Sequence, residues 1–246
     1  LKTRAVREGD HYIVNGQKTW TTLAQYADWI FLLVRTNPEA TKQQEGISFL
    51  LVDMNTPGIT VKPIINLEYH DEFCEVFFDN VRVPAANLVG TPNRGWDMAK
   101  ALLSFERIYL GSPRLSAYAF SRLKQLAERM GVWEDAVFQD TYAKLRLDLE
   151  DLKSLYGVFV DKVRRGETLG PDVSMLKVFQ TELFQRITDT MLEICGENAG
   201  LLDPMEGNRN LNPTGLYIQA RPSTIYGGSN EIQRNIISKN VLALPG

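Results

Sequence analysis

The stretch Gly90-Thr91-Pro92-Asn93-Arg94-Gly95-Trp96 separates two parts of the sequence whose hydrophobic residues follow different periods. Before it, short β-rich runs are separated by turn residues, whereas after it apolar residues recur at helical spacing. The sequence therefore predicts an α+β protein of two domains. An antiparallel β sandwich or barrel is expected over residues 1–92 and a helical bundle over residues 93–246.

About five short segments of the first part are predicted strands. Asn15-Gly16 tolerates the positive φ angles of a two-residue turn, so it predicts a hairpin between Tyr12-Ile13-Val14 and the residues that follow. The other predicted strands are Ala27–Thr36, Ile47–Met54, Ile59–Ile64 and Cys74–Val83. Short strands at this spacing are typical of a sandwich or barrel.

The second part predicts four long helical segments. The first runs from Trp96 to Gly131 and should be interrupted at Pro113, which lacks an amide donor. The second runs from Ala136 to about Arg165 and should stop at Gly166. A third is expected from Pro171 to Cys195, and a last one from the cap residue Ser229 to Leu244.

Composition excludes several classes of protein. The 246 residues are 44% hydrophobic and carry a net charge of −3, so no positive field attracts nucleic acid. The longest apolar runs, such as Trp29–Val34, are far shorter than the ~20 residues of a membrane-spanning helix. Cys74 and Cys195 form no metal or disulfide motif, and no metal site is predicted. The sequence favours a cytoplasmic protein, and its start at Leu1 suggests a fragment.

Three local patterns carry chemistry. The first is Asn15–Thr22, in which Trp20 and Thr22 could cover a planar heterocycle and donate a hydrogen bond to a ring nitrogen. The second is Gly227-Gly228-Ser229-Asn230-Glu231, where two glycines lead into a helix N-terminus that suits a phosphate. Taken alone, the first pattern is better explained by a core Trp with surface threonines. The second, taken alone, is no more specific than a glycine turn with a serine cap.

The third pattern is Glu106 within the apolar segment Ser104–Ile108. Desolvation in an apolar cleft would raise the pKa of this carboxyl, which suits a general base near neutral pH. The alternative is an exposed glutamate paired with a neighbouring cation such as Lys100. Spacing alone favours that alternative.

The three patterns together resemble the FAD-dependent acyl-CoA dehydrogenase family, and within it bacterial proteins described as large subunits of pimeloyl-CoA dehydrogenase. The resemblance implies a middle β domain followed by an up-down four-helix bundle. The family's N-terminal helical domain, with its Thr-Glu-Pro…Gly-Ser-Asp loop, has no counterpart in this sequence.

Site residues follow from the resemblance. It implies that Trp20 covers the flavin ring and that the hydroxyl of Thr22 forms a hydrogen bond with flavin N5. It implies further cofactor contacts and two substrate contacts. The cofactor contacts would come from Gln139, Gly196, Gly228, Ser229 and Glu231, and the substrate contacts from Arg107 and Gly227.

The catalytic base is the most informative comparison. Many members carry a glutamate where this sequence has Gly227, while a minority carry it on the first helix of the C-terminal domain, where Glu106 stands. The resemblance therefore implies α,β-dehydrogenation of an acyl-CoA thioester in β-oxidation, with Glu106 taking the α-proton as hydride passes to flavin N5.

Partners and alternatives also follow from the resemblance. An electron-transferring flavoprotein is the implied electron acceptor. The implied assembly is a homodimer, a homotetramer or a heteromer with a related subunit. Two other functions stay open: a flavoprotein oxidase or monooxygenase of the same fold, and a non-catalytic partner subunit of a heteromeric dehydrogenase.

Overall fold

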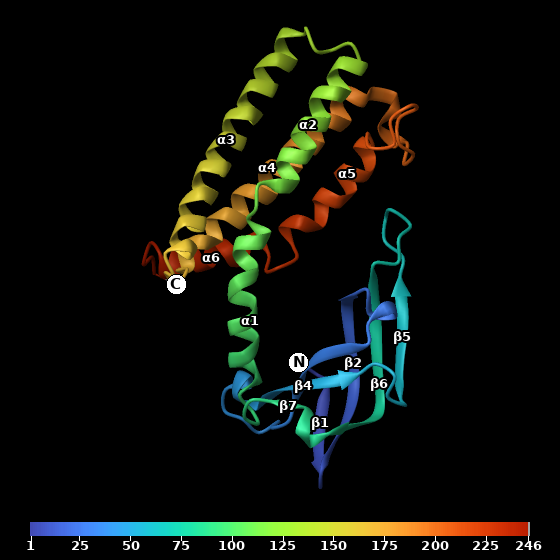
Figure 1. Ribbon diagram of the computed structural model, residues 1–246, viewed down its shortest axis with the longest axis vertical. Helices are drawn as coiled ribbons and strands as arrows, with labels where there is room; N and C mark the ends of the chain where they lie inside the picture. The colour runs from blue at the N-terminus through green and yellow to red at the C-terminus, as the bar shows by residue number, and fades with distance from the viewer. Residues whose placement is uncertain (246) are drawn as a thin grey trace. The chain divides into compact units, whose positions relative to one another are not determined.

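The computed structural model describes residues 1–245, except for the side chains of residues 103–107. The chain forms two compact units, Leu1–Leu103 and Ser104–Gly246. Each has a hydrophobic core of its own. They are called the β unit and the helical unit below (Figure 1).

The β unit is a single hydrogen-bonded sheet in the order β5-β6-β2-β1-β3-β4-β7. Neighbouring strands are antiparallel except β1 and β3, which meet in parallel at one pair, Arg4 with Arg35. Because this junction is so short, β3, β4 and β7 turn across the direction of β2, β6 and β5 (Figure 1). The strands are β1 (Arg4–Glu8), β2 (His11–Thr22), β3 (Trp29–Arg35), β4 (Ile47–Asp53), β5 (Ile59–Ile64), β6 (Phe73–Pro84) and β7 (Leu88–Val89).

One hydrophobic core joins the two halves of this sheet. Val14 and Val76 come from one half, while Leu32 and Leu50 come from the other, and all are fully buried. Alternation along each strand places these aliphatic residues inward. The sequence prediction of a β domain is confirmed, although it missed β1 and the two-residue β7.

The predicted hairpin turn at Asn15-Gly16 is wrong. Strand β2 continues through both residues, and the turn lies at Gly9-Asp10, between the paired residues Glu8 and His11. Gly16 is needed for another reason: a Cβ atom there would lie 2.7 Å from the Cα of Thr3. The Gly-Asp pair was the true hairpin signal, since Gly9 has a φ of 61°.

The segment that separates the two parts of the sequence is anchored to the β unit. The backbone amide of Asn93 donates to Ser48 Oγ at 2.8 Å, and Thr36 Oγ1 donates to Asn93 Oδ1 at 2.7 Å. A Cβ atom at Gly95 would lie 2.4 Å from the backbone of Ser48, so only glycine allows this approach. Helix α1 (Gly95–Leu110) starts from this anchor.

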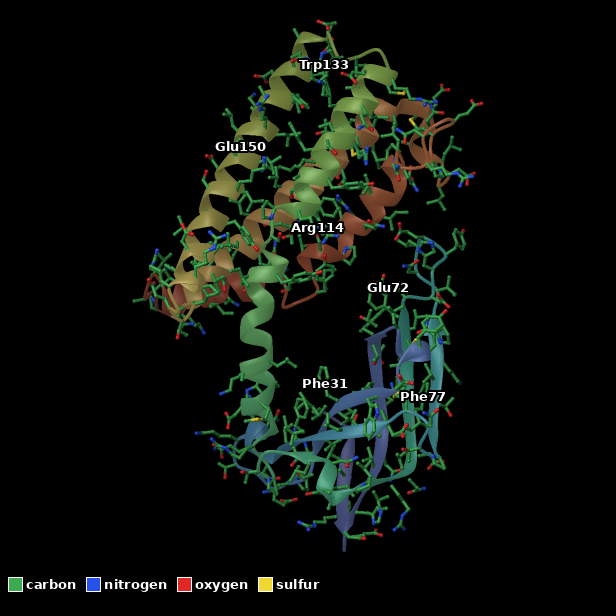
Figure 2. All side chains as sticks on the ribbon, viewed as in Figure 1. Phe31, Glu72, Phe77, Arg114, Trp133 and Glu150 are labelled. Atoms are coloured by element: carbon green, nitrogen blue, oxygen red, sulfur yellow. The ribbon has the colours of Figure 1, made fainter. Side chains whose placement is uncertain are left out.

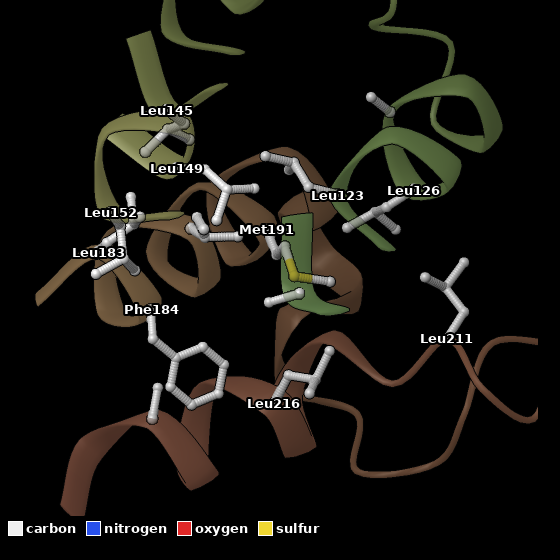
Figure 3. Close-up of a cluster of buried hydrophobic side chains, with 14 of the residues drawn as sticks. Leu123, Leu126, Leu145, Leu149, Leu152, Leu183, Phe184, Met191, Leu211 and Leu216 are labelled. Carbon is white, nitrogen blue, oxygen red and sulfur yellow. The ribbon is translucent and has the colours of Figure 1, made fainter. Parts of the chain in front are cut away.

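The helical unit is a bundle of α2 (Arg114–Arg129), α3 (Ala136–Arg164), α4 (Ser174–Cys195) and α5 (Pro213–Ala220). Helix α6 (Asn230–Asn240) crosses the end of the bundle where α3 ends and α4 begins (Figure 1). Leucines of α2 and α3 pack against Leu183, Phe184 and Met191 of α4, with Leu216 of α5 beside them (Figure 3). The predicted four-helix bundle is confirmed, but its fourth helix is α5 rather than the helix expected from Ser229.

The helix boundaries agree closely with the sequence. The break at Pro113 separates α1 from α2, and α3 and α4 end at Arg164 and Cys195. Helix α5 was missed, because its eight residues lie directly after a stretch rich in Gly, Asn and Pro. Helix α6 ends at Asn240 rather than at Leu244.

Candidate functional site

Trp20 lies on a β-bulge at the end of β2. The register between β2 and β6 shifts between Lys18 and Thr21, leaving one extra residue on β2, and Trp20 adopts a φ of 62°. The bulge turns the indole outward, so Trp20 is 66% exposed. Its ring meets Phe73 edge to face at 6.0 Å between centroids, and Phe73 is the residue paired with Thr22. The indole and the exposed Thr22 therefore lie close together at the end of one strand.

Lys18 holds the strand just before this bulge. Its Nζ donates to the Leu33 carbonyl at 2.7 Å, which links β2 to β3 beyond the reach of β1. Burial lowers the pKa of Lys18 to about 8. The hydrogen bond fixes the point at which β2 leaves the regular ladder.

The β unit exposes further aromatic side chains. Trp29 and Phe31 alternate with buried positions on β3, and each is 56% exposed. Phe31 stacks on Phe49 with ring centroids 5.3 Å apart (Figure 2 labels Phe31). Tyr26 is exposed as well. Exposed apolar side chains mark a binding surface where they form a contiguous patch, whereas single exposed ones are common on any protein.

A side chain at either glycine of the turn before α6 would require a neighbouring side chain to move. Gly227 and Gly228 have φ angles of 64° and 83°. A Cβ atom at Gly227 would lie 2.1 Å from Leu110 Cδ1, and one at Gly228 would lie 2.9 Å from Gln233 Nε2. Leu110, at the end of α1, thus occupies the space that a side chain at Gly227 would need.

Ser229 caps helix α6, as the sequence predicts. Its side chain accepts a hydrogen bond from the Ile232 amide. A hydrogen bond with Ser229 also holds the pKa of Glu231 below its usual value. The amides of a helix's first turn and its dipole together favour an anion.

Two buried polar side chains, Asn230 and Gln233, hold the inner side of the turn before α6. Asn230 is 2% exposed, accepts a hydrogen bond from Lys177 Nζ at 2.8 Å and donates to Thr181 Oγ1 at 3.0 Å. Gln233 is also buried, and its Nε2 donates to the Gly227 carbonyl at 3.2 Å. Lys177, Asn230 and Gln233 were not among the residues predicted from the sequence. No signal in the sequence separates this lysine from the exposed ones.

Gln139 and Gly196 lie at the other end of the helical unit. Gln139 is in the first turn of α3 and its side chain donates to the carbonyl of Trp133 (Figure 2 labels Trp133). Gly196 follows the last residue of α4, whereas Lys177, which contacts the α6 turn, lies near its start. Eighteen residues separate Lys177 from Cys195, or ~27 Å at 1.5 Å per residue. Among the predicted site residues of the helical unit, Gly227, Gly228, Ser229 and Glu231 lie together at the start of α6. Within one chain, Gln139 and Gly196 lie far from that turn.

Two predicted site residues, Glu106 and Arg107, have side chains outside the described part of the structure. Their roles stay predictions. Cys74 and Cys195 are buried free thiols.

A surface cavity of about 230 Å³ lies beside the start of α1. It is lined by Lys42, Arg94 and Lys100, by the carboxylates of Glu45 and Asp97, and by Trp96. Ion pairs join Arg94 and Lys100 to Asp97, so one cation in excess remains. Within the described residues, no three His, Cys, Asp or Glu side chains gather where a metal ion could bind. Nor is any described helix both long enough and apolar enough to cross a membrane.

Both parts of the chain match models of one known family. The model of the acyl-CoA dehydrogenase middle domain matches residues 1–81, and that of the C-terminal domain matches residues 93–242. The chain belongs to the acyl-CoA dehydrogenase family. Members of this family are generally FAD-dependent.

Its relatives are similar over the whole chain. Acyl-CoA dehydrogenase IpdE1 of Mycobacterium tuberculosis is 35% identical over 247 residues, which cover 100% of this chain and 63% of that protein. A solved Tcur3481-Tcur3483 steroid ACAD superposes with a TM-score of 0.90 at 29% identity, covering 100% of this chain and 64% of that one. The ChsE4-ChsE5 complex from Mycobacterium tuberculosis gives a TM-score of 0.86 at 32% identity, covering 100% and 65%.

The chain therefore spans less than two thirds of the length of these relatives.

Proposed function

We propose that this chain forms the flavin- and substrate-binding part of an acyl-CoA dehydrogenase that acts by α,β-dehydrogenation, with Glu106 as the base. The observation that carries the proposal is the contact between Gly227 and Leu110. Many family members place the catalytic glutamate at the position of Gly227, but here Leu110 fills that space. A base must then come from elsewhere.

The spacing of the sequence supports Glu106 as that base. Glu106 precedes Leu110 by four positions, a spacing that puts two residues on one face of an α-helix. Glu106 would therefore lie on the face of α1 that reaches Gly227 through Leu110. From that face its carboxylate would act on the same substrate atom as a glutamate at position 227 in other family members. Glu106 would accept the α-proton of the thioester, which requires a pKa near working pH.

The residues present fit FAD. The exposed indole of Trp20 and the hydroxyl of Thr22 suit a flat heterocycle, and the glycine turn with its Ser229 cap suits a phosphate. When bound, FAD supplies the hydride acceptor, because no protein side chain can carry out that redox step. The protein would align the α-carbon with Glu106, and the backbone at Gly227 would stabilise the developing enolate charge.

The substrate would be an acyl-CoA thioester. The cavity lined by Lys42, Arg94 and Lys100 has one excess cation and an aromatic ring, which suits the phosphates and purine of coenzyme A. Relatives described as steroid dehydrogenases favour a bulky acyl group, while the resemblance to pimeloyl-CoA dehydrogenases favours a dicarboxylic one.

The assembly would be an oligomer or a heteromer. Gln139 and Gly196 lie about the length of α4 from the turn at Ser229, so they would reach a flavin only from a neighbouring subunit. The solved ChsE4-ChsE5 complex supports a related subunit as that neighbour. An electron-transferring flavoprotein would accept the electrons.

The test is a substrate screen on the full-length protein. Straight, branched, dicarboxylic and steroid acyl-CoA esters would be added, and flavin bleaching followed without oxygen. We expect bleaching with at least one class, and Glu106→Gln is expected to slow it by ~10²–10⁴. Glu128→Gln is the matched control, because Glu128 only forms an exposed ion pair with Lys124 on α2. Peroxide formation without bleaching would favour an oxidase, and a flavin-free subunit that folds normally would favour a non-catalytic partner. Full activity of Glu106→Gln would remove Glu106 as the base.

A further inference from the structure

The fully buried lysine of helix α4 has no part in the function proposed above. Lys177 has no solvent-exposed surface and is one of the largest completely buried side chains of the described residues. A buried ammonium group costs several kcal/mol in desolvation, and an apolar residue of similar volume often stabilises a fold better. Stability of the bundle therefore does not explain a lysine at this position.

Lys177 forms a hydrogen bond with Asn230, at the start of α6. Its Nζ donates to Asn230 Oδ1 at 2.8 Å, and Asn230 is the first residue of α6, directly after the cap Ser229. Asn230 Nδ2 donates to Thr181 Oγ1 at 3.0 Å and to Glu182 Oε1 at 3.3 Å, so three residues of α4 orient this amide. These hydrogen bonds tie the first turn of α6 to α4.

A second contact completes the frame around the glycine turn. Gln233 Nε2 donates to the carbonyls of Gly227 and Gly228 at 3.2 and 3.4 Å. Asn230 and Gln233 thus hold the inner side of the segment from opposite ends of the first helical turn. Gly228, the cap Ser229 and Glu231 are left on the outer side, where Gly228 and Glu231 are exposed.

The electrostatics of this arrangement are unfavourable in spite of two nearby carboxylates. The ammonium of Lys177 lies beneath the positive end of the α6 dipole. Glu182 and Glu231 are the carboxylates that interact with it, yet desolvation outweighs both and lowers the pKa of Lys177 to about 8. An arrangement with this cost is typical of a site that positions residues for a ligand.

We propose that Lys177 is a positioning residue, which through Asn230 fixes the Gly227–Ser229 turn in the shape that receives the flavin. The proposal rests on the function proposed above for this turn, and it assigns to Lys177 no direct contact with cofactor or substrate. Its role is to keep the turn ordered before the ligand arrives, which lowers the entropy lost on binding.

The first test measures local order with Lys177→Met in the full-length protein. We expect amide hydrogen exchange in residues 226–236 to accelerate at least tenfold, while residues 183–191 in the core of α4 keep their wild-type rate. Lys153→Met is the matched control, because Lys153 forms an exposed ion pair with Glu150 on α3. Unchanged exchange in residues 226–236, or equal acceleration in both segments, would overturn the proposal.

The second test is a double-mutant cycle with Asn230→Ala, read out by the dissociation constant of FAD. Lys177→Met is expected to weaken FAD binding about tenfold in the wild-type background and not at all in the Asn230→Ala background. Lys177→Gln keeps a donor for Asn230, so its dissociation constant for FAD should lie between those of the wild type and Lys177→Met. This variant replaces Lys177→Met in the cycle if Lys177→Met folds poorly. Additive effects would show that Lys177 does not act through Asn230. If the wild-type protein bound no FAD, the proposed function would fail, while the exchange experiment would still decide the role of Lys177.

Discussion

The two units depart from ordinary burial in opposite ways. The β unit exposes large aromatic side chains, including Trp20, Trp29 and Phe31, whereas every side chain of its core is aliphatic or only weakly polar apart from Tyr12 and Phe78. The helical unit instead buries polar side chains, among them Lys177, Asn230 and Gln233, beneath one short helix. Each departure includes one predicted flavin-binding segment, namely Trp20 in the β unit and the turn before α6 in the helical unit.

The difference suggests two ways of building a binding surface. A strand end can present a flat apolar face simply by turning a ring outward at a bulge. A helix N-terminus presents backbone amides, so what matters is how firmly its first turn is held. In the proposed function, the β unit would contribute side chains to flavin binding, and the helical unit would contribute an ordered backbone.

Strand β3 offers the sharpest comparison between a structural and a surface position. Leu32 is fully buried, and its neighbour Phe31 is 56% exposed on the opposite face. We expect Leu32→Ala to lower the free energy of unfolding by ~2–5 kcal/mol, because it leaves a cavity in the core. Phe31→Ala should cost only about 1 kcal/mol, since it mainly loses the stacking on Phe49. Urea denaturation of both variants measures the difference; equal losses would mean that Phe31 belongs to the core.

Gly227→Glu is expected to have the next largest effect. It introduces a side chain at a positive φ and against Leu110, which together should cost ~1–3 kcal/mol. Gly196→Glu is the matched control, because Gly196 also has a positive φ but a Cβ atom there would meet nothing within 4 Å. Adding Leu110→Ala to Gly227→Glu should restore part of the stability. No restoration would show that strain in the backbone, rather than Leu110, keeps a side chain out.

Stability should respond to pH through Lys177. Burial lowers the folded-state pKa to about 8 from the ordinary 10.5, so between these values the unfolded chain binds more protons than the folded one. The contribution of Lys177 to stability therefore rises with pH across that window, with a slope of at most ~1.4 kcal/mol per pH unit, and is constant below it. Lys18 shifts in the same direction, so the quantity to measure is wild type minus Lys177→Met. A difference that stays constant from pH 8 to 10.5 would contradict the assignment.

Much of this arrangement could be predicted from the sequence, and the reasons for the exceptions are physical. The helix break at Pro113, the stop at Gly166 and the cap at Ser229 depend on local backbone chemistry, which a sequence shows directly. The turn predicted at Asn15-Gly16 was wrong, because Gly16 is a glycine for another reason. A side chain there would collide with Thr3, which only the folded sheet brings close. The Lys177–Asn230 contact joins residues 53 positions apart, so no local pattern announces it.

The smallest change in stability is expected for Trp20→Ala. The indole is mostly exposed, and removing its edge contact with Phe73 should lower the free energy of unfolding by less than about 1 kcal/mol. Flavin binding should nevertheless weaken about tenfold or more, because a stacked aromatic contact with a flat heterocycle contributes ~1–3 kcal/mol. Trp29→Ala removes an equally large exposed indole from β3 and is expected to leave flavin affinity unchanged. Equal weakening by both variants would mean that the flavin depends on the whole exposed aromatic face rather than on the bulge that turns Trp20 outward.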